Sequence, residues 1–176
     1  FPALRGAYQL SNAACALTVL ECLNEKLPVD IGAIKRGLLL VENPGRFQVL
    51  PGRPLTVLDV GHNPHAARAL RRSLINLAFA QKRTAVFSML SDKDIDGVLE
   101  IVKDQFDEWY IAPLDVPRGM TAEALQAKLE AQNIENIQTF TSVREAYRAA
   151  LAKAGENDRI VVFGSFHTVA DVMAAL

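Results

Sequence analysis

The sequence predicts an α/β protein in which a mostly parallel sheet of about six strands has helices on both faces and follows two helices. Two observations predict this fold. Short apolar runs recur after residue 54, separated by helical stretches of ten or more residues, and this alternation is typical of parallel strands joined by crossover helices. Before residue 43, by contrast, the apolar residues follow only a helical period.

The first two expected elements are helices. Residues 11–24 carry apolar side chains at helical spacing, and Asp30 is a suitable N-cap for a second helix. Cys15 and Cys22 are seven residues apart in the first helix, so we expect both on one buried face as reduced thiols.

A Pro-Gly turn signal then interrupts the helical period within residues 42–47. We therefore place a domain boundary near residue 43. The chain divides into a helical part with the linker, residues 1–43, and an α/β domain, residues 44–176.

The α/β domain is expected to contain four clear strands and two weaker ones. The clear strands are the apolar runs at residues 55–60, 84–90, 108–112 and 159–163. A weaker strand is predicted at 137–140, and residues 47–50 can pair as an antiparallel hairpin partner through the turn at 51–54. Helical stripes and a capping box, Ser142-Val-Arg-Glu145, mark the helices between the strands.

Composition excludes several classes of function. Half of the residues are hydrophobic, 22% are charged and the net charge is −1, so no basic excess points to nucleic acid. We find no apolar run long enough to span a membrane and no signal-peptide pattern. We therefore expect a cytoplasmic protein that binds neither nucleic acid nor membrane.

The most informative segment is Leu58-Asp-Val-Gly-His-Asn-Pro-His65, where a strand ends in polar residues and a helix begins with Asn63 and Pro64. Parallel sheets bind ligands at the carboxyl ends of their strands, and helix amino termini favour anions. Asp59 can then hold ribose hydroxyls while His62 faces a phosphate or acyl group. Two alternatives stay open: the polar residues only fix the turn, or Asp59, His62 and His65 bind a metal.

Other polar side chains follow the same pattern. Arg46 lies in the linker, where a guanidinium can reach phosphate oxygens. Lys93 follows the strand at 84–90 and can pair with a carboxylate, and Ser165 and His167 follow the last strand. Each has a plainer interpretation as a solvated linker, a solvated loop or a capped helix start. The sequence contains neither G-x-x-x-x-G-K-[ST] nor G-x-G-x-x-G, so if the protein acts on ATP, the loop that binds its phosphates lies elsewhere.

Three features occur in order along the chain: Asn12, Pro44-Gly-Arg-Phe47 and Asp59-Val-Gly-His-Asn-Pro64. Together they resemble the motifs of the folylpolyglutamate synthase/dihydrofolate synthase family, a branch of the Mur ligase superfamily. Later segments resemble the bacterial bifunctional enzymes in particular: Ser91-Asp-Lys-Asp94, Asp107-Glu-Trp-Tyr110, Ala112-Pro, Pro117-Arg-Gly119 and Gly164-Ser-Phe-His-Thr-Val169. The resemblance implies the Rossmann-like carboxy-terminal domain of a ligase whose own amino-terminal domain, absent here, holds the phosphate loop, the Mg²⁺ ligands and the pterin site.

The resemblance also implies an activity. ATP would phosphorylate the carboxylate of dihydropteroate or of a tetrahydrofolate, and L-glutamate would attack the acyl phosphate. Asn12, Arg46 and Asp59 would bind the nucleotide, and His62 would lie beside the transferred phosphate. By looser analogy, Lys93, Ser165 and His167 would hold the incoming glutamate. We expect a monomer that is inactive without its amino-terminal domain. The alternatives are another amide ligase of the superfamily and a non-catalytic nucleotide-binding module.

Overall fold

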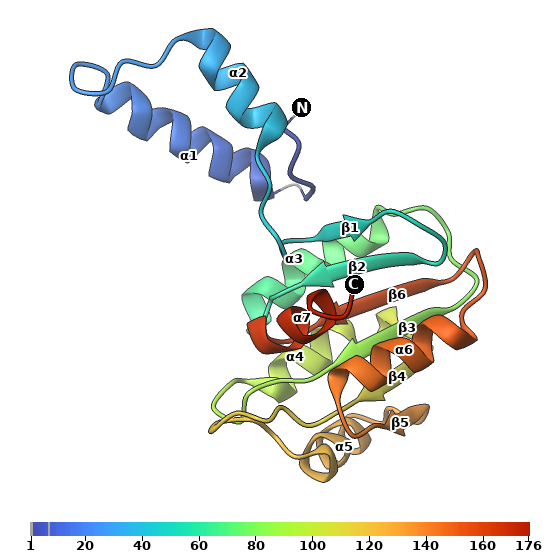
Figure 1. The fold of residues 1–176 in the computed structure, drawn as a ribbon. Coiled ribbons are helices and arrows are strands. Elements are labelled where there is room, and N and C mark those ends of the chain that lie inside the picture. Colours follow the sequence, from blue (N-terminus) through green and yellow to red (C-terminus); the bar gives the residue numbers. More distant parts are fainter. Residues whose placement is uncertain (1, 7) are drawn as a thin grey trace.

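The computed structural model describes residues 2–6 and 8–176. It contains the predicted six-stranded sheet, in the order β1-β2-β6-β3-β4-β5, and only β1 runs antiparallel to its neighbour (Figure 1). The strands are β1 Gln48–Leu50, β2 Leu55–Asp59, β3 Arg83–Phe87, β4 Glu108–Ile111, β5 Ile137–Thr139 and β6 Arg159–Phe163. All six predicted strands are confirmed, four of them one or more residues shorter than expected at the carboxyl end because the chain turns there.

Seven α-helices and one short 3₁₀ helix surround or precede the sheet within the described residues. They are α1 Tyr8–Cys22, α2 Ile31–Leu40, α3 Pro64–Ile75, α4 Ile95–Val102, η1 Lys103–Gln105, α5 Ala122–Ala131, α6 Val143–Lys153 and α7 Phe166–Met173. No helix in the described part of the chain combines the length and apolar character needed to cross a membrane.

Helices α1 and α2 stand away from the sheet rather than packing on it (Figure 1). Only Gln9 is buried in α1, and no residue of α2 is buried. The expectation of buried cysteines is therefore wrong: Cys15 and Cys22 are free thiols, as expected, but both are exposed. Helical spacing predicts that they share a face, but it cannot tell whether another element covers that face.

The core lies on both faces of the sheet, as β6 illustrates. Val161 and Phe163 belong to a cluster with α3, α4 and α5, whereas Ile160 and Val162 belong to a second cluster with α6 and α7. Successive side chains of a strand point to opposite faces, so an unbroken apolar run is what a strand covered on both sides requires.

Local capping signals were read correctly with one exception. Asp30, Asn63 and Asp94 each accept a hydrogen bond from the backbone of the helix that they precede. At α6, Ser142 accepts from the Glu145 amide, but the Glu145 carboxylate accepts from Thr141 rather than completing the expected reciprocal bond to Ser142. The helix begins where predicted because the Ser142 half of the box is sufficient.

Candidate ligand site at the carboxyl edge of the sheet

The strand order brings together turns that are distant in sequence. Strand β6 lies between β2 and β3, with Phe163 in register with Asp59 on one side and with Phe87 on the other. The turns that follow these three parallel strands therefore lie side by side at one edge. This is the position where open α/β sheets bind ligands.

Asp59 fastens the linker to this edge. Its Oδ2 accepts the Phe47 amide at 3.0 Å and its Oδ1 accepts the Gly61 amide at 2.7 Å. The side chain is buried, and burial raises the pKa of Asp59 above its ordinary value although these two amides and Arg46 oppose the shift. Because a carboxylate oxygen has more than one lone pair, Asp59 can still accept hydroxyl groups from a ligand.

Arg46, His62 and Phe166 form a cluster beside Asp59. The Arg46 Cζ lies 5.5 Å from the centroid of the Phe166 ring, and the His62 ring centroid lies 6.0 Å from the same ring. The His62 Nδ1 is 3.0 Å from the Val60 carbonyl oxygen, so the tautomer that donates there leaves Nε2 free to accept a proton. The cluster thus joins a cation and a proton acceptor from two different turns.

The start of α1 reaches the same place. The pKa of the Tyr8 hydroxyl is raised by burial and by the negative charge of Asp59, while Arg46 lowers it, so the three groups are electrostatic neighbours. Asn12 donates to the Gln9 side chain at 3.0 Å and lies one helical turn beyond Tyr8, on the same face of α1. Asn12 is exposed, and its amide can contact a ligand that extends along this face.

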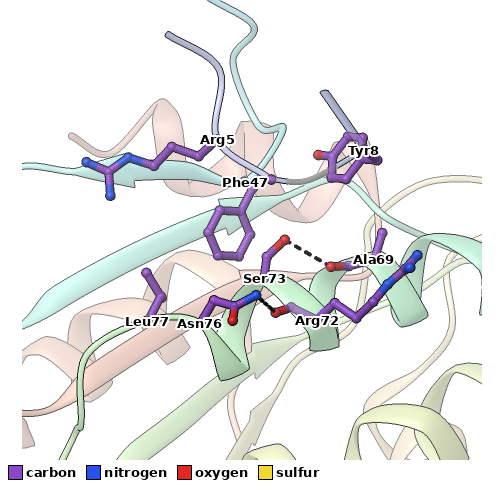
Figure 2. Close-up of a pocket in the computed structure, with 9 residues that line it drawn as sticks. Arg5, Tyr8, Phe47, Ala69, Arg72, Ser73, Asn76 and Leu77 are labelled. Atoms are coloured by element: carbon purple, nitrogen blue, oxygen red, sulfur yellow. Dashed lines mark hydrogen bonds between the residues drawn. The ribbon is translucent and has the colours of Figure 1, made fainter. Parts of the chain in front are cut away.

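A small cavity of about 220 Å³ lies next to Tyr8, between the amino-terminal segment and α3. Figure 2 shows the buried Phe47 ring among the residues that line it, with Arg5 and Tyr8 on one side and Ser73 of α3 on the other. Phe47 therefore holds the linker in two ways: its backbone amide donates to Asp59, and its aromatic side chain packs beside α3.

Ser165 and Lys93 lie at the neighbouring turns. Ser165 is buried and its hydroxyl accepts the His167 amide at 3.1 Å, which makes it the N-cap of α7. Lys93 Nζ lies 3.4 Å from Asp92 Oδ2, which also receives Arg118 at 2.7 Å. The plainer interpretation of Ser165 as a helix cap is confirmed, and Lys93 lies in a loop with a neighbouring ion pair; the contacts of both residues to glutamate remain a prediction.

His167 does not face the Arg46 cluster. It lines a separate pocket of about 760 Å³ beyond the carboxyl ends of β4 and β5, together with Thr121, Ser142 and Asp171. Consecutive residues of a helix point about 100° apart, so Phe166 and His167 lie toward different surroundings. The alternative metal site is not assembled either, because the described residues contain no group of three His, Cys, Asp or Glu side chains that converge on one point.

Sequence reasoning missed Tyr8 and Phe166 as members of the cluster. Phe166 is part of the segment Gly164-Ser-Phe-His-Thr-Val169, but an aromatic residue at the start of a helix does not indicate which side chain it will contact. Tyr8 carried no signal at all, because its neighbours Asp59 and Arg46 are about forty or more residues away in the chain.

The fold is that of an α/β domain, and its polar cluster lies at the carboxyl ends of parallel strands, where open sheets of this class bind ligands. More specifically, residues 45–166 match the family of Mur ligase, glutamate ligase domains, and the chain belongs to that family. The dihydrofolate synthase/folylpolyglutamate synthase of Escherichia coli is 43% identical over 165 residues, which cover 94% of this chain and 37% of that protein.

Solved structures give the same relationship. E. coli FolC in complex with DHPP and ADP has a TM-score of 0.88 at 42% identity, covering 99% of this chain and 40% of that one. A bifunctional folylpolyglutamate synthase/dihydrofolate synthase with Mn, AMPPNP and L-glutamate bound has a TM-score of 0.83 at 47% identity, covering 94% and 39%. The chain therefore spans about two fifths of the length of these relatives.

Proposed function

We propose that this chain is the carboxy-terminal part of an ATP-dependent ligase that adds L-glutamate to dihydropteroate, to a tetrahydrofolate, or to both. The observation that carries the proposal is the attachment of Arg46, through its neighbour Phe47, to the Asp59 carboxylate at the strand end. A linker cation and a strand-end acceptor are thereby held at one edge. Relatives with the same domain are dihydrofolate synthase/folylpolyglutamate synthases.

In this proposal the chain supplies half of a site between two domains. Asn12 would contact the adenine base, Asp59 would accept the ribose hydroxyls and Arg46 would pair with the phosphates. His62, with its Nε2 free, would lie beside the transferred phosphate. Phosphorylation of the acceptor carboxylate would give an acyl phosphate, which the glutamate amine attacks. Positioning and charge stabilisation supply most of such catalysis.

Lys93 and Ser165 would bind the two carboxylates of glutamate, since both lie at turns adjacent to the Arg46 cluster. His167 is retained only as a candidate for the far end of the glutamate or of a folate tail, because it faces the neighbouring pocket. Mg²⁺ would be held mainly by the preceding domain, as the described residues here offer no cluster of three ligands. The domain boundary near residue 43 and a cytoplasmic, monomeric protein are part of the same proposal.

A ligase assay tests this proposal. The chain and the full-length protein are each supplied with ATP, Mg²⁺, L-glutamate and either dihydropteroate or tetrahydrofolate. We expect activity only in the full-length protein, and we expect Arg46→Ala to reduce kcat/KM for ATP by at least tenfold, because an Arg–phosphate pair is lost.

Arg53→Ala is the matched control. Arg53 is an exposed arginine at the opposite, amino edge of the sheet, and its only ion-pair partner among the described residues is Glu156, at 3.6 Å. Activity in the chain alone, or equal losses from both arginine variants, would contradict the proposed site. Turnover of another acceptor in place of both pterins would instead indicate a different amide ligase of the superfamily.

A further inference from the structure

We propose that Phe166 is a positioning residue whose ring holds the Arg46 guanidinium, and with it the His62 imidazole, ready for the phosphates of the nucleotide. The inference deepens the proposed function and rests on it. Phe166 is the first residue of α7, and 55% of its surface is exposed. Within the described residues, it is the one aromatic ring that contacts both Arg46 and His62.

The linker needs such a partner. The backbone around Arg46 is fixed, because Val60 donates to the Gly45 carbonyl at 2.7 Å and the Arg46 amide donates to Asn43 at 3.2 Å. Its side chain has no ion pair among the residues that the structure describes, and a long arginine side chain otherwise samples many rotamers. A ring 5.5 Å from Cζ lies within the range of a cation–π contact.

An aromatic face suits this role better than a carboxylate. A carboxylate would form an ion pair with Arg46 and would have to be displaced by each incoming phosphate. A ring attracts the cation through its quadrupole and leaves its charge and its N–H donors available. The tilted contact of the same ring with His62, at 49° between the ring planes, restricts the imidazole on the opposite side of the cluster.

The contact can be measured in the chain without any assay of activity. By NMR we expect the Arg46 side-chain protons to be shifted upfield by the Phe166 ring. Phe166→Leu should remove this shift, and Phe166→Tyr, which keeps the ring, should preserve it. Phe79→Leu is the matched control, because Phe79 is 89% exposed and makes no aromatic or cation–π contact in the described part. No upfield shift in the wild-type chain would overturn the inference.

In the full-length ligase, Phe166→Leu should raise KM for ATP about two- to fivefold, the value of an exposed cation–π contact, with KM for glutamate unchanged and Phe166→Tyr close to wild type. In an Arg46→Ala background, Phe166→Leu should add nothing. A full additional loss in that background, or an effect on glutamate alone, would overturn the positioning role. Absence of ligase activity in the wild-type protein would contradict the proposed function, and the NMR comparison would still decide whether Phe166 holds Arg46.

Discussion

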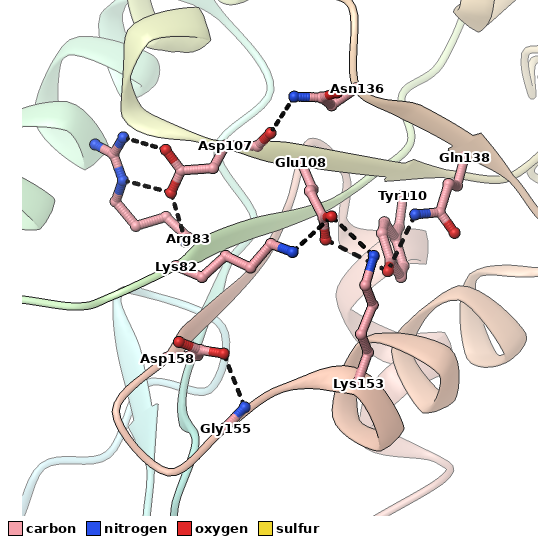
Figure 3. Close-up of polar contacts among 10 residues, drawn as sticks. All are labelled: Lys82, Arg83, Asp107, Glu108, Tyr110, Asn136, Gln138, Lys153, Gly155 and Asp158. Atoms are coloured by element: carbon pink, nitrogen blue, oxygen red, sulfur yellow. Dashed lines mark hydrogen bonds and ion pairs between the residues drawn. The ribbon is translucent and has the colours of Figure 1, made fainter.

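The Asp59 turn at the carboxyl edge of the sheet and the Glu108 network at the amino edge hold their charges in different ways. At the amino edge, Glu108 receives Lys82 at 2.7 Å and Lys153 at 2.8 Å, and Arg83 and Asp107 form a two-bond pair (Figure 3). At the carboxyl edge, the hydrogen bonds to Asp59 within the described residues come from backbone amides, and the Arg46 guanidinium lies over an aromatic ring. The neighbouring turn differs, because Asp92 there is paired with Lys93 and Arg118. Charges that are already paired stabilise the fold, whereas charges held by neutral groups remain available to a ligand.

The pKa values follow the same division. Burial alone would raise the pKa of Glu108, but hydrogen bonds from Lys153 and Lys82 hold it below its ordinary value. Burial raises the pKa of Asp59, and among the described residues no cation bonds directly to it. Perturbed pKa values are common at functional sites, so the Asp59 turn has the character of a site and the Glu108 network that of a structural one.

The largest effect among these variants is expected at Gly164, where the turn after β6 packs closely against the turn after β3. Gly164 has φ +111, and a Cβ there would lie 2.5 Å from the Ser88 carbonyl oxygen. Gly164→Ala should reduce the free energy of unfolding by about 3 kcal/mol, from strain and overlap together. Gly155→Ala at the amino edge is the control, because its added methyl would meet nothing closer than 3.6 Å. Urea unfolding of both variants checks this, and similar stabilities would show that the carboxyl turn can relax.

Ser165 tests whether the cap of α7 also has a binding role. Ser165→Ala should cost about 1 kcal/mol of stability, as loss of an N-cap does, and Ser142→Ala should cost about the same because Ser142 caps α6 in the same way. Only Ser165→Ala should raise KM for glutamate in the full-length ligase. An increase from Ser142→Ala instead would move the glutamate site to the pocket that contains His167.

Glu108 tests the stabilising role of the amino edge. Glu108→Gln should lower the free energy of unfolding by about 0.5 to 1 kcal/mol at pH 7, because the partner lysines are partly exposed and the pairs are screened, and it should leave KM for ATP unchanged. Since the folded pKa of Glu108 is depressed, this contribution is present above the unfolded pKa of about 4.3 and is lost as the pH falls through the folded pKa. An equal cost of Glu108→Gln at pH 3 and pH 7 would argue against ion pairing.

Asp59 should show the opposite dependence on pH. Its folded pKa is raised, so the stability linked to its protonation is present below the unfolded pKa of about 3.9 and is lost as the pH rises through the folded value. Asp59→Asn should therefore cost most at low pH and less at neutral pH. Chemical denaturation across this range measures the trend, and NMR titration should show Asp107 ionising before Asp59. If Asp59 ionised before Asp107, the proposed difference between the Asp59 turn and the ion-paired residues of the amino edge would be wrong.

Much of the fold could be predicted because its signals are local. Asn63 and Pro64 mark the start of α3 within two residues, and the unbroken apolar run of β6 indicates a strand covered on both faces. Asp59, Lys93 and Ser165 lie at or after strand ends as expected, because a polar residue that follows an apolar strand lies where that strand ends, whereas Asn12 lies on helix α1. The strand order could not be predicted in this way, because the insertion of β6 between β2 and β3 depends on contacts between residues about 75 to 100 positions apart.

The sequence by itself determined the six strands, the helix caps and the motifs that resemble folate ligases, because each depends on neighbouring residues or on a short spacing. Only the tertiary structure decided that Phe166 lies against Arg46, that Tyr8 reaches Asp59, that His167 turns into another pocket and that the cysteines are exposed. The physical reason is the same in each case. Which side chains meet depends on how elements pack across the sheet, and no local pattern of residues carries that information.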